Sequence, residues 1–291
     1  ATGECSVTVT APTATDNCAG TVTGTTSDPT TYNVQGSYVV TWTFDDGNGN
    51  TSTATQNVIV DDVTAPSAPT IADATGECSV TVSAPTATDN CAGTVTGTTS
   101  DPTTYNVQGS YVVTWTFDDG NGNTSTATQN VIVDDVTAPT APTIADATGE
   151  CSVTVTAPTA TDNCGGTVTG TTSDPTTYST QGSYTVTWTF DDGNGNTSTA
   201  TQNVIVDDVT APAAPGSLPD VVAECSATLT APTASDNCAG TITATTTDPV
   251  SYIAQGNYTV TWTFDDGNGN VSSVDQNVII DDVTAPSAPT L

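Results

Sequence analysis

Residues 36–60 of the chain read GSYVVTWTFDDGNGNTSTATQNVIV. In the first half of this stretch polar and apolar side chains alternate, which is the period of a β-strand with one buried face. The residues on the apolar face are Tyr38, Val40, Trp42 and Phe44. The Asp-Gly-Asn-Gly sequence at 46–49 is a strong signal for a hairpin turn. The stretch therefore predicts a β-hairpin whose aromatic face forms a core.

The second strand of this hairpin is expected at residues 53–60. Pairing with the first strand would place Val58 and Val60 on the buried face. The tryptophans, which alternate with apolar residues, are interpreted as core residues rather than as a sugar-binding platform. They are Trp42, Trp115, Trp188 and Trp262.

The rest of the unit also follows a period of two. Val7 and Val9 alternate with threonines in an expected first strand, and Val22 begins another. No stretch shows the i, i+3, i+4 spacing of an amphipathic helix. Short strands with tight turns predict an all-β fold with the architecture of a β-sandwich.

This unit occurs four times in the 291-residue chain. The first cysteine of the unit occurs at Cys5, Cys78, Cys151 and Cys225, so successive copies are 73, 73 and 74 residues apart. We expect one domain per copy, at residues 1–66, 74–139, 147–212 and 220–286. Proline-rich linkers are expected at 64–73, 137–146 and 210–219, where prolines spaced by three favour an extended, semi-rigid connector. These features predict domains arranged end to end as a rod.

The two ends of the chain fit the same period. Residues 281–291 followed by residues 1–5 would form a normal linker if another copy followed, so we expect the chain to come from a longer array. A tandem array of near-identical copies indicates a spacer or a multivalent binder before it indicates an enzyme.

Cysteine is a second repeated feature. Each copy has two cysteines 13 residues apart, and even numbers of cysteines in small units indicate disulfides and an extracellular location. The spacing predicts bonds within each repeat: Cys5–Cys18, Cys78–Cys91, Cys151–Cys164 and Cys225–Cys238. Pairing between neighbouring repeats is the alternative. A metal site on these cysteines has little support, because it would need CxxC-type spacing or histidine partners and the chain has no histidine.

The charge of the chain is one-sided. It has 32 acidic residues and no Lys, Arg or His, which gives a formal net charge of -32 at pH 7. Nucleic acids and anionic membranes are excluded as direct partners, because binding their phosphates takes Lys and Arg. Catalysis also has little support, since Asp and Glu are the only acid–base candidates, and we expect no enzyme. Cations are the natural counter-charge.

The turn at residues 45–50 offers side-chain oxygens at alternate positions, an arrangement that hard cations prefer. It is not an EF-hand, because Thr51 stands where that loop needs glycine and Asn57 where it needs glutamate. The same residues also form tight hairpins without any ion.

The sandwich topology favours a cation more strongly than the turn does. The chain leaves such a sandwich at the end opposite to the one where it begins, so the exit of one repeat meets the loops of the next. Asp61 and Asp62 would then approach Asp89, Asp118 and Asp119. Carboxylates crowded without a base favour a bound cation, and calcium, which takes roughly six to eight oxygen ligands, fits. The alternative is that these acids only solvate the loop ends.

The predicted calcium ligands recur in all four repeats. They are Asp16, Asp45, Asp46, Asp61, Asp62, Asp89, Asp118, Asp119, Asp134, Asp135, Asp162, Asp191, Asp192, Asp207, Asp208, Asp236, Asp265 and Asp266.

Four strings carry a family resemblance: PTATDNC at 12–18, QGSYVVTW at 35–42, DGNGN at 46–50 and DDVTAP at 61–66. On these motifs all four copies resemble hyalin-repeat (HYR-like) immunoglobulin-type domains, and are similar to arrays in large cell-surface adhesins of Bacteroidetes. The resemblance implies secretion, an immunoglobulin-like β-sandwich fold for each repeat and a role in adhesion or as the stalk of an adhesin. Hyalin repeats of animals place a cysteine in the last strand. This chain has none there, so that family's disulfide pattern is not carried over.

The sequence therefore predicts a structural stalk or filament segment of an extracellular bacterial surface adhesin, with calcium at the domain junctions and one disulfide per repeat. The expected partners are neighbouring repeats of the same polypeptide, and direct insertion into a membrane is not expected. One alternative is a multivalent array that binds carbohydrate or a cell surface, with Tyr32 as its candidate aromatic residue. Another is a filament subunit that assembles with other copies.

Overall fold

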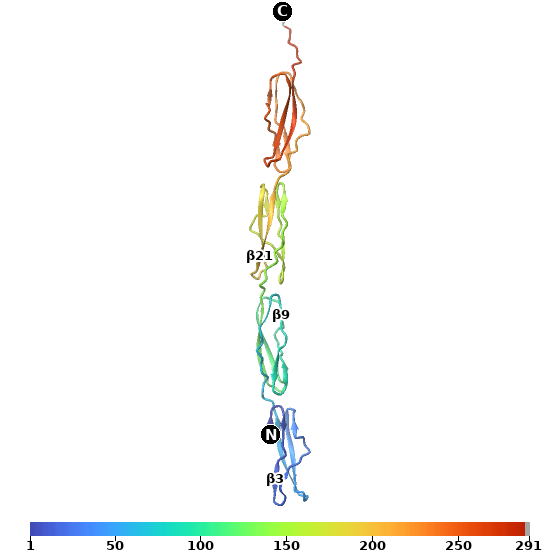
Figure 1. The fold of residues 1–291 in the computed structure, drawn as a ribbon, viewed down its shortest axis with the longest axis vertical. Helices are drawn as coiled ribbons and strands as arrows, with labels where there is room; N and C mark the ends of the chain where they lie inside the picture. Colours follow the sequence, from blue (N-terminus) through green and yellow to red (C-terminus); the bar gives the residue numbers. More distant parts are fainter. Residues whose placement is uncertain (289–291) are drawn as a thin grey trace. The chain divides into compact units, whose positions relative to one another are not determined.

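The structure is a computed structural model that describes residues 1–288 of the chain. The regular elements in this range are all β-strands, which confirms the predicted all-β class (Figure 1). Nothing in the same range forms a helix long and apolar enough to cross a lipid bilayer. The chain divides into two compact units, Ala1–Val136 and Thr137–Leu291, and each unit contains two repeats.

The first unit contains fourteen strands, seven in each repeat. Those of repeat 1 are β1 (Thr2–Gly3), β2 (Val7–Thr8), β3 (Thr13–Asp16), β4 (Gly20–Thr23), β5 (Thr31–Tyr32), β6 (Gly36–Asp45) and β7 (Thr51–Val60). Those of repeat 2 are β8 (Ala74–Gly76), β9 (Val80–Thr81), β10 (Thr86–Asp89), β11 (Gly93–Thr96), β12 (Thr104–Tyr105), β13 (Gly109–Asp118) and β14 (Thr124–Val133).

The described part of the second unit repeats this order. Repeat 3 has β15 (Ala147–Gly149), β16 (Val153–Thr154), β17 (Thr159–Asp162), β18 (Gly166–Thr169), β19 (Thr177–Tyr178), β20 (Gly182–Asp191) and β21 (Thr197–Val206). Repeat 4 has β22 (Val221–Ala223), β23 (Ala227–Thr228), β24 (Thr233–Asp236), β25 (Gly240–Thr243), β26 (Ser251–Tyr252), β27 (Gly256–Asp265) and β28 (Val271–Ile280).

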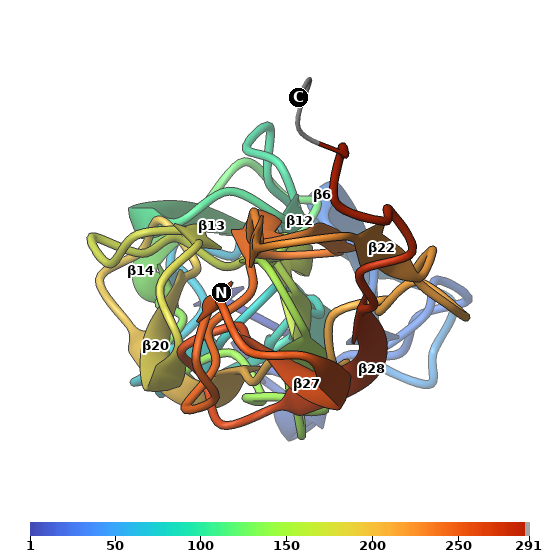
Figure 2. The same ribbon diagram turned by 90° about the horizontal axis from the view of Figure 1, so that it is seen from above.

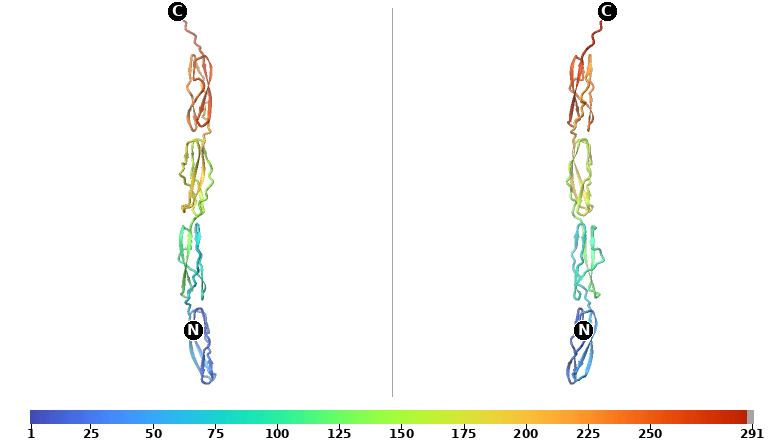
Figure 3. Two further views of the ribbon diagram at one scale, coloured as in Figure 1. Left: turned by 60° about the vertical axis from the view of Figure 1, so that its left-hand side comes forward. Right: turned by 90° about the vertical axis from the view of Figure 1, so that its right-hand side faces the viewer.

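Each repeat is a two-layered sandwich. In repeat 2 one layer is the three-stranded sheet β8-β14-β13, and the other consists of the pairs β9–β12 and β10–β11. Figure 3 shows the long hairpin of each repeat facing its shorter strands, and Figure 2 shows the hairpin strands β27 and β28 side by side. The other three repeats have the same strand order, so the repeated sequence gives a repeated fold.

The core lies between the two layers. In repeat 2 Trp115 is 2% exposed and Phe117 is fully buried on β13. They pack with Val131 of β14 and with Val80 of β9. The one polar atom of the indole is satisfied, since Trp115 Nε1 donates to Gln129 Oε1 at 3.2 Å. The alternating pattern was therefore a correct guide to the buried face.

The same holds in repeat 1, where the buried face was predicted from residues 36–60. Its buried core includes Val40, Trp42, Val58 and Val60, and Tyr38 and Phe44 are partly buried against it. Val7 and Val9, from the predicted first strand, are buried in the same core.

Each repeat also begins with a short strand that the sequence analysis did not locate. β8 runs parallel to β14, with Thr75 opposite Ile132. Three residues are too few to show an alternating pattern. Gly76 at its end is required by close approach, because a Cβ there would lie 2.6 Å from the carbonyl oxygen of Ser79.

The first predicted linker, residues 64–73, is bound to the repeat that follows it. Pro66 is buried, and the backbone N–H of Ser67 donates to the carbonyl of Thr88 at 2.8 Å. Ile71 packs against the core of repeat 2. The linker therefore contributes to the fold of the next repeat, in addition to connecting it.

The second unit shows the same use of its linkers. Thr140 pairs with Thr161, and Ala213 pairs with Ser235. Leu218 packs against the core of repeat 4.

Candidate metal centre

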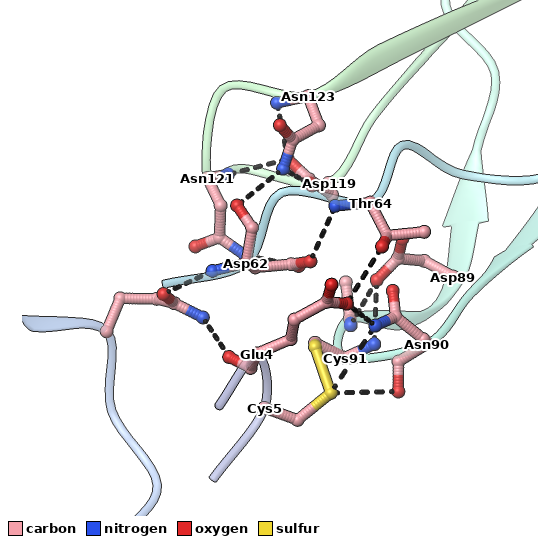
Figure 4. Close-up of a disulfide and its surroundings, with 12 residues drawn as sticks. Glu4, Cys5, Asp62, Thr64, Asp89, Asn90, Cys91, Asp119, Asn121 and Asn123 are labelled. Atoms are coloured by element: carbon pink, nitrogen blue, oxygen red, sulfur yellow. Dashed lines mark hydrogen bonds between the residues drawn. A yellow bond between two sulfur atoms is a disulfide. The ribbon is translucent and has the colours of Figure 1, made fainter. Parts of the chain in front are cut away.

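Several predicted carboxylates converge where repeat 1 ends and repeat 2 begins (Figure 4). We call this place the joint. One side of it is the exit segment of repeat 1, residues 61–67, which follows β7. The other side consists of two loops of repeat 2, residues 90–92 between β10 and β11 and residues 119–123 between β13 and β14.

The exit segment fixes one carboxylate, that of Asp62. Asp61 still bonds to the sheet through its backbone N–H, which donates to the carbonyl of Gly3 at 3.0 Å. Asp62 is only 4% exposed, and its N–H donates to Gln35 Oε1 at 2.8 Å. Its Oδ1 accepts from the N–H of Thr64 at 3.2 Å. These bonds hold an acidic side chain at the joint.

The second carboxylate stands at the end of β10. Asp89 Oδ1 accepts from the backbone N–H groups of Cys91 at 2.8 Å and Ala92 at 2.7 Å, which closes the loop. Its other oxygen, Oδ2, is buried and has no hydrogen-bond partner among the described residues. A buried acceptor without a donor is costly, so this oxygen is a candidate ligand atom for a cation.

The third carboxylate belongs to the hairpin turn between β13 and β14. Asp119 Oδ1 accepts from the N–H groups of Asn121 at 2.8 Å and Asn123 at 3.1 Å, and Oδ2 accepts from Asn123 Nδ2 at 2.7 Å. Gly120 and Gly122 allow this turn, because their φ angles are 81° and 106°. Burial raises the pKa of Asp119, but the hydrogen bonds from Asn123 and Asn121 outweigh it and lower the pKa below its ordinary value. This carboxyl is therefore ionised at neutral pH.

Asp62, Asp89 and Asp119 each offer a carboxylate oxygen, and these oxygens lie within 4.8 Å of one another. Two side-chain amides of repeat 2, those of Asn121 and Asn123, also bond to Asp62. Asn121 Nδ2 donates to Asp62 Oδ2 at 3.1 Å, and Asn123 Nδ2 donates to the Asp62 carbonyl at 2.9 Å. The chain has no Lys, Arg or His to neutralise the three acids.

The donor set suits a hard divalent cation. Each of the three carboxylates can bind an ion through one or two oxygens. Together they could supply many of the roughly six to eight oxygen ligands that calcium takes. Calcium also accepts irregular geometry, whereas magnesium demands a near-ideal octahedron. The unpartnered Oδ2 of Asp89 is the atom that such an ion would satisfy.

The second unit contains an equivalent joint between repeats 3 and 4. Asp208 is 3% exposed, and its Oδ2 accepts from Asn268 Nδ2 at 3.1 Å. Asn270 Nδ2 bonds both to the carbonyl of Asp208 at 2.8 Å and to Asp266 Oδ2 at 2.7 Å. Asp236 Oδ2 is buried without a partner among the described residues, as Asp89 Oδ2 is.

A disulfide crosses each of these two joints, which corrects the predicted pairing. Cys5 of repeat 1 is bonded to Cys91 of repeat 2 (Figure 4), and Cys151 of repeat 3 is bonded to Cys238 of repeat 4. Cys78 and Cys164 are also in disulfides, whereas Cys18 and Cys225 are free and exposed. The predicted bonds Cys5–Cys18, Cys78–Cys91, Cys151–Cys164 and Cys225–Cys238 are therefore wrong, and the alternative of pairing between repeats is correct for the bonds at these joints.

The physical reason is the path of the chain between the two cysteines of one repeat. Cys5 lies beside the exit segment, since the neighbouring Glu4 accepts from Thr64 Oγ1 at 2.8 Å. Cys18 lies in the loop between β3 and β4, which corresponds to the loop that receives the previous repeat at the joint. The 12 residues between them carry the chain from one end of the sandwich to the other. Spacing in the sequence gave no measure of that distance.

The sequence analysis also missed a glutamate and its partner at each joint. Glu4 Oε2 accepts from Asn90 Nδ2 of the next repeat at 2.6 Å, and Glu150 Oε2 accepts from Asn237 Nδ2 at 2.5 Å. A signal was present, because glutamate occurs only before the first cysteine of each repeat. The four positions are Glu4, Glu77, Glu150 and Glu224.

Other predicted ligands lie beside the joints or at the ends of strands. Asp61, Asp134 and Asp207 are exposed and donate their backbone N–H groups to the first strand of their own repeats. Asp118, Asp191 and Asp265 are exposed, and each accepts from a glycine N–H in the hairpin turn.

The remaining predicted ligands are less exposed. Asp192 makes the same turn contacts as Asp119, and Asp135 is 3% exposed. Asp162 Oδ2 closes its own loop by accepting from two backbone N–H groups. A role for these residues in binding metal stays a prediction.

Three of the predicted ligands lie in repeat 1, on the side that has no preceding repeat within this chain. Asp16 Oδ1 accepts from the N–H groups of Cys18 and Ala19, as Asp89 does in repeat 2. Asp45 Oδ1 accepts from Gly47. Asp46 is half-buried, and hydrogen bonds led by the side chain of Asn50 lower its pKa.

Comparison with known proteins gives two curated relatives and a set of weakly similar structures. The chain is 35% identical to hyalin of Strongylocentrotus purpuratus over 323 aligned residues, which cover 95% of this chain and 26% of that protein. It is 35% identical to hyalin of Lytechinus variegatus over 293 aligned residues, covering 90% of this chain and 55% of that protein. The chain thus spans about a quarter and about half of these relatives. No family model matches it.

Among solved structures, a tetra-tandem repeat from the extending region of a large adhesion protein is 22% identical. The alignment covers 93% of this chain and 91% of that one, with a TM-score of 0.27. A Ca2+-stabilized adhesin of an Antarctic bacterium is 17% identical, with coverages of 90% and 87% and a TM-score of 0.30. The identity to hyalin over most of the chain supports a hyalin-repeat-like assignment for the repeats.

Proposed function

We propose that this chain is a structural segment, a stalk or filament, of an extracellular or cell-surface adhesion protein, with calcium bound at its joints. The adhesion role rests on the hyalin-repeat resemblance and on the identity to hyalin over 95% of the chain. The extracellular location also accords with the disulfides, which persist in oxidising surroundings. A large adhesin of Bacteroidetes is the host protein that the resemblance suggests.

The observation that carries the proposal is the construction of the joint. A disulfide, a buried linker proline and a set of hydrogen bonds all tie one repeat to the next. Three carboxylates meet there without a base, and Asp89 Oδ2 has no partner among the described residues. Like charges at this distance repel, and a cation among them would turn the repulsion into attraction. Repeats that are joined by covalent and non-covalent contacts suit a spacer that bears mechanical load.

Calcium would be held by Asp62, Asp89 and Asp119 in the first unit and by Asp208, Asp236 and Asp266 in the second. When bound, it would supply the positive charge that the chain lacks. The chain's own residues do the positioning, since each of these carboxylates is fixed by backbone or amide hydrogen bonds. No catalytic role is proposed for them.

Isothermal titration of the EDTA-stripped chain with calcium tests this proposal. The informative variant combines Asp89→Asn with Asp236→Asn, which keeps the shape of each side chain and removes one charge from each joint. The matched control is Asp16→Asn, because Asp16 has the same loop position but lies at no joint within residues 1–291. We expect the wild type to bind calcium more tightly than magnesium.

The double variant should lose two tight sites, and the control should lose none. Absence of calcium binding by the wild type would contradict the calcium proposal. A double variant that titrates like the wild type would contradict the assignment of the ligands.

A multivalent ligand-binding array is the second candidate, and a recurring surface groove is what favours it. The groove has a volume of about 400 Å³ in repeat 1 and contains Tyr32 and Val34. Tyr32 itself is only 9% exposed and stacks on Tyr38 with ring centroids 4.5 Å apart, so it is no open platform for a sugar. The position of Val34 is occupied by Thr180 in repeat 3, so the four grooves differ. Binding of the chain to a glycan array, weakened when Val34→Asp and Val107→Asp are combined, would support this candidate over a pure spacer.

A further inference from the structure

One long strand of each repeat lies at the edge of its sheet. In repeat 2 this strand is β13, which has β14 on one side and no strand of its sheet on the other. Thr116 of β13 and Thr98 each donate a backbone N–H to the other's carbonyl at 2.8 Å, so the backbone groups of Thr116 point away from β14. Inward and outward pairs alternate along an antiparallel strand, so the backbone groups of Thr114, Val112 and Ser110 also point outward.

The preceding segment of the chain covers only part of this edge. Asp101 Oδ2 accepts from the backbone N–H of Thr114 at 2.7 Å, which closes the edge there. Pro102 follows, and the chain then joins the other layer as β12, which pairs with β9. In the described part of the chain, the outward backbone groups of Ser110 and Val112 take part in no hydrogen bond. An open edge of this kind can pair with a further strand.

A groove of about 400 Å³ lies beside the open edge. Its lining includes Tyr111 and Val112 of β13 and, from the preceding segment, Asp101, Tyr105 and Val107. Both valines are exposed, so apolar surface borders the groove. We call it the edge groove.

The edge groove recurs in all four repeats with a constant acidic and aromatic part. Each copy contains two tyrosines in ring contact and a half-buried aspartate that precedes a proline. The aspartates are Asp28, Asp101, Asp174 and Asp248. The position of Val112 is taken by Val39, Thr185 and Thr259 in the other repeats, so it is β-branched in every copy. The chain has no Lys, Arg or His to neutralise the four aspartates.

The geometry of strand pairing shows which side chain of an added strand would enter the groove. If two of its residues paired with Ser110 and Val112, the residue between them would lie opposite Tyr111. Side chains alternate across a sheet, so this residue would share the face of Tyr111, whose half-buried ring lines the groove. The two flanking side chains would lie on the other face, beside the exposed Val112.

The chemistry of the groove favours a basic residue at the central position. The aliphatic stem of Lys or Arg would pack on the apolar lining, and the charged end would meet the carboxylate of Asp101. β-branched side chains at the flanking positions would pack against Val112. A second copy of this chain is disfavoured as the occupant, because it would bring acidic residues and no base.

We propose that each edge groove binds an extended peptide segment of a protein partner by strand addition, with a Lys or Arg in the groove between two β-branched residues. The partner strand exchanges backbone hydrogen bonds with Ser110 and Val112 in repeat 2, and with the equivalent residues in the other repeats. A partner with several such segments gains avidity from the four grooves. This inference goes beyond the proposed structural role and does not depend on a cation at the joints.

Fluorescence anisotropy of a labelled peptide tests the proposal on the full chain. The probe is Gly-Thr-Val-Lys-Val-Thr-Gly with blocked ends and a neutral dye. One comparison peptide has Glu in place of Lys. The other carries N-methyl groups on both valines, which removes two backbone donors and keeps the charge. We expect the chain to bind the probe at least about ten-fold more tightly than it binds either comparison peptide.

A variant of the chain separates the groove from general charge attraction. The groove variant combines Asp28→Asn, Asp101→Asn, Asp174→Asn and Asp248→Asn, which keeps an acceptor for the N–H of Thr114 and its equivalents. The matched control removes four exposed charges elsewhere, through Asp73→Asn, Asp146→Asn, Asp220→Asn and Asp275→Asn. The groove variant should bind the probe about ten-fold more weakly than the wild type, and the control should bind it as the wild type does.

Hydrogen exchange locates the bound peptide. The probe should slow exchange of the backbone N–H groups of Ser110, Val112 and their equivalents. Equal affinity for the N-methylated peptide, a groove variant that binds like the control, or protection confined to other segments would overturn the proposal. Self-association of the chain that the probe displaces would make a second copy the occupant and would also overturn it. Each titration is run in calcium and in excess EDTA, so the result is independent of the calcium proposal.

Discussion

At the scale of single residues, alternation in the sequence predicted which side chains are buried, and it did so because the β-strand period is a backbone property. Trp42 and Val58 could be assigned to the core from their neighbours alone. Which acid of the pair Asp61 and Asp62 turns inward could not be assigned. That choice depends on Gln35, which lies far away in the sequence and binds the N–H of Asp62.

Substitution of a core tryptophan is expected to be severe. Trp115→Ala removes a side chain that is 2% exposed and leaves Gln129 without its indole partner. Truncation of a buried Trp costs about 3–5 kcal/mol of unfolding free energy. Urea unfolding of the variant should show this loss in repeat 2. The control Val112→Ala, on the same strand but 56% exposed, should stay within about 0.5 kcal/mol of the wild type.

Tyrosine ionisation should control stability at alkaline pH. Burial raises the pKa of Tyr105, and the charges of Asp101 and Tyr111 raise it further. Because the pKa is higher in the folded protein, this stabilisation is complete below the unfolded pKa of about 10 and is lost as the pH rises through the folded pKa. The chain has no Lys or Arg, so no basic side chain titrates in the same alkaline pH range.

Urea unfolding between pH 8 and 12 (roughly two units either side of the tyrosine pKa) should therefore show a fall in stability, accompanied by tyrosinate absorbance. The titration should include tyrosines that ionise above the ordinary pKa, since burial raises the pKa of Tyr32, Tyr178 and Tyr252 as it does that of Tyr105. A single titration at the pKa of free tyrosine would contradict this expectation.

At the scale of elements, the hairpin could be predicted and the first strand could not. β13 and β14 are ten residues each and are joined by a glycine turn, so both the alternation and the turn signal are visible. β8 has three residues and is held by parallel pairing to β14, the last strand of the repeat in the sequence. The disulfides escaped prediction for a related reason, because they are set by the contact between two repeats rather than by spacing within one.

Digestion with a protease that cleaves after glutamate distinguishes disulfides between repeats from disulfides within repeats. Cuts after Glu77 and Glu150 place Cys5 and Cys91 on different fragments, and the cut after Glu224 does the same for Cys151 and Cys238. Digestion in denaturant without reductant should leave the members of each pair joined, and reductant should release them. Bonds within each repeat would instead leave the fragments separate, which mass spectrometry of the digest would show.

At the scale of the whole molecule, the repeat period predicted four equivalent folds, and each repeat has its own buried core. The convergence of Asp62, Asp89 and Asp119 could also be anticipated, because a sandwich begins and ends at opposite ends. That Cys18 and Cys225 are free could not be anticipated, because the cysteines at the joints pair between repeats. The converging carboxylates and the disulfides between repeats have one structural cause, because each joint is formed by residues from two neighbouring repeats.

The thermal unfolding midpoint tests most directly the proposal that a calcium ion is bound at each joint. The chain would be heated in calcium, in magnesium and in excess EDTA, with the Asp89→Asn, Asp236→Asn double variant measured beside it. A ligand at about one hundred times its dissociation constant stabilises the folded state by about 2.7 kcal/mol, so calcium should raise the midpoint by several degrees over EDTA. Magnesium and the double variant should show little of this rise. Equal midpoints in calcium and EDTA would contradict the claim and leave joints held by disulfides, prolines and hydrogen bonds.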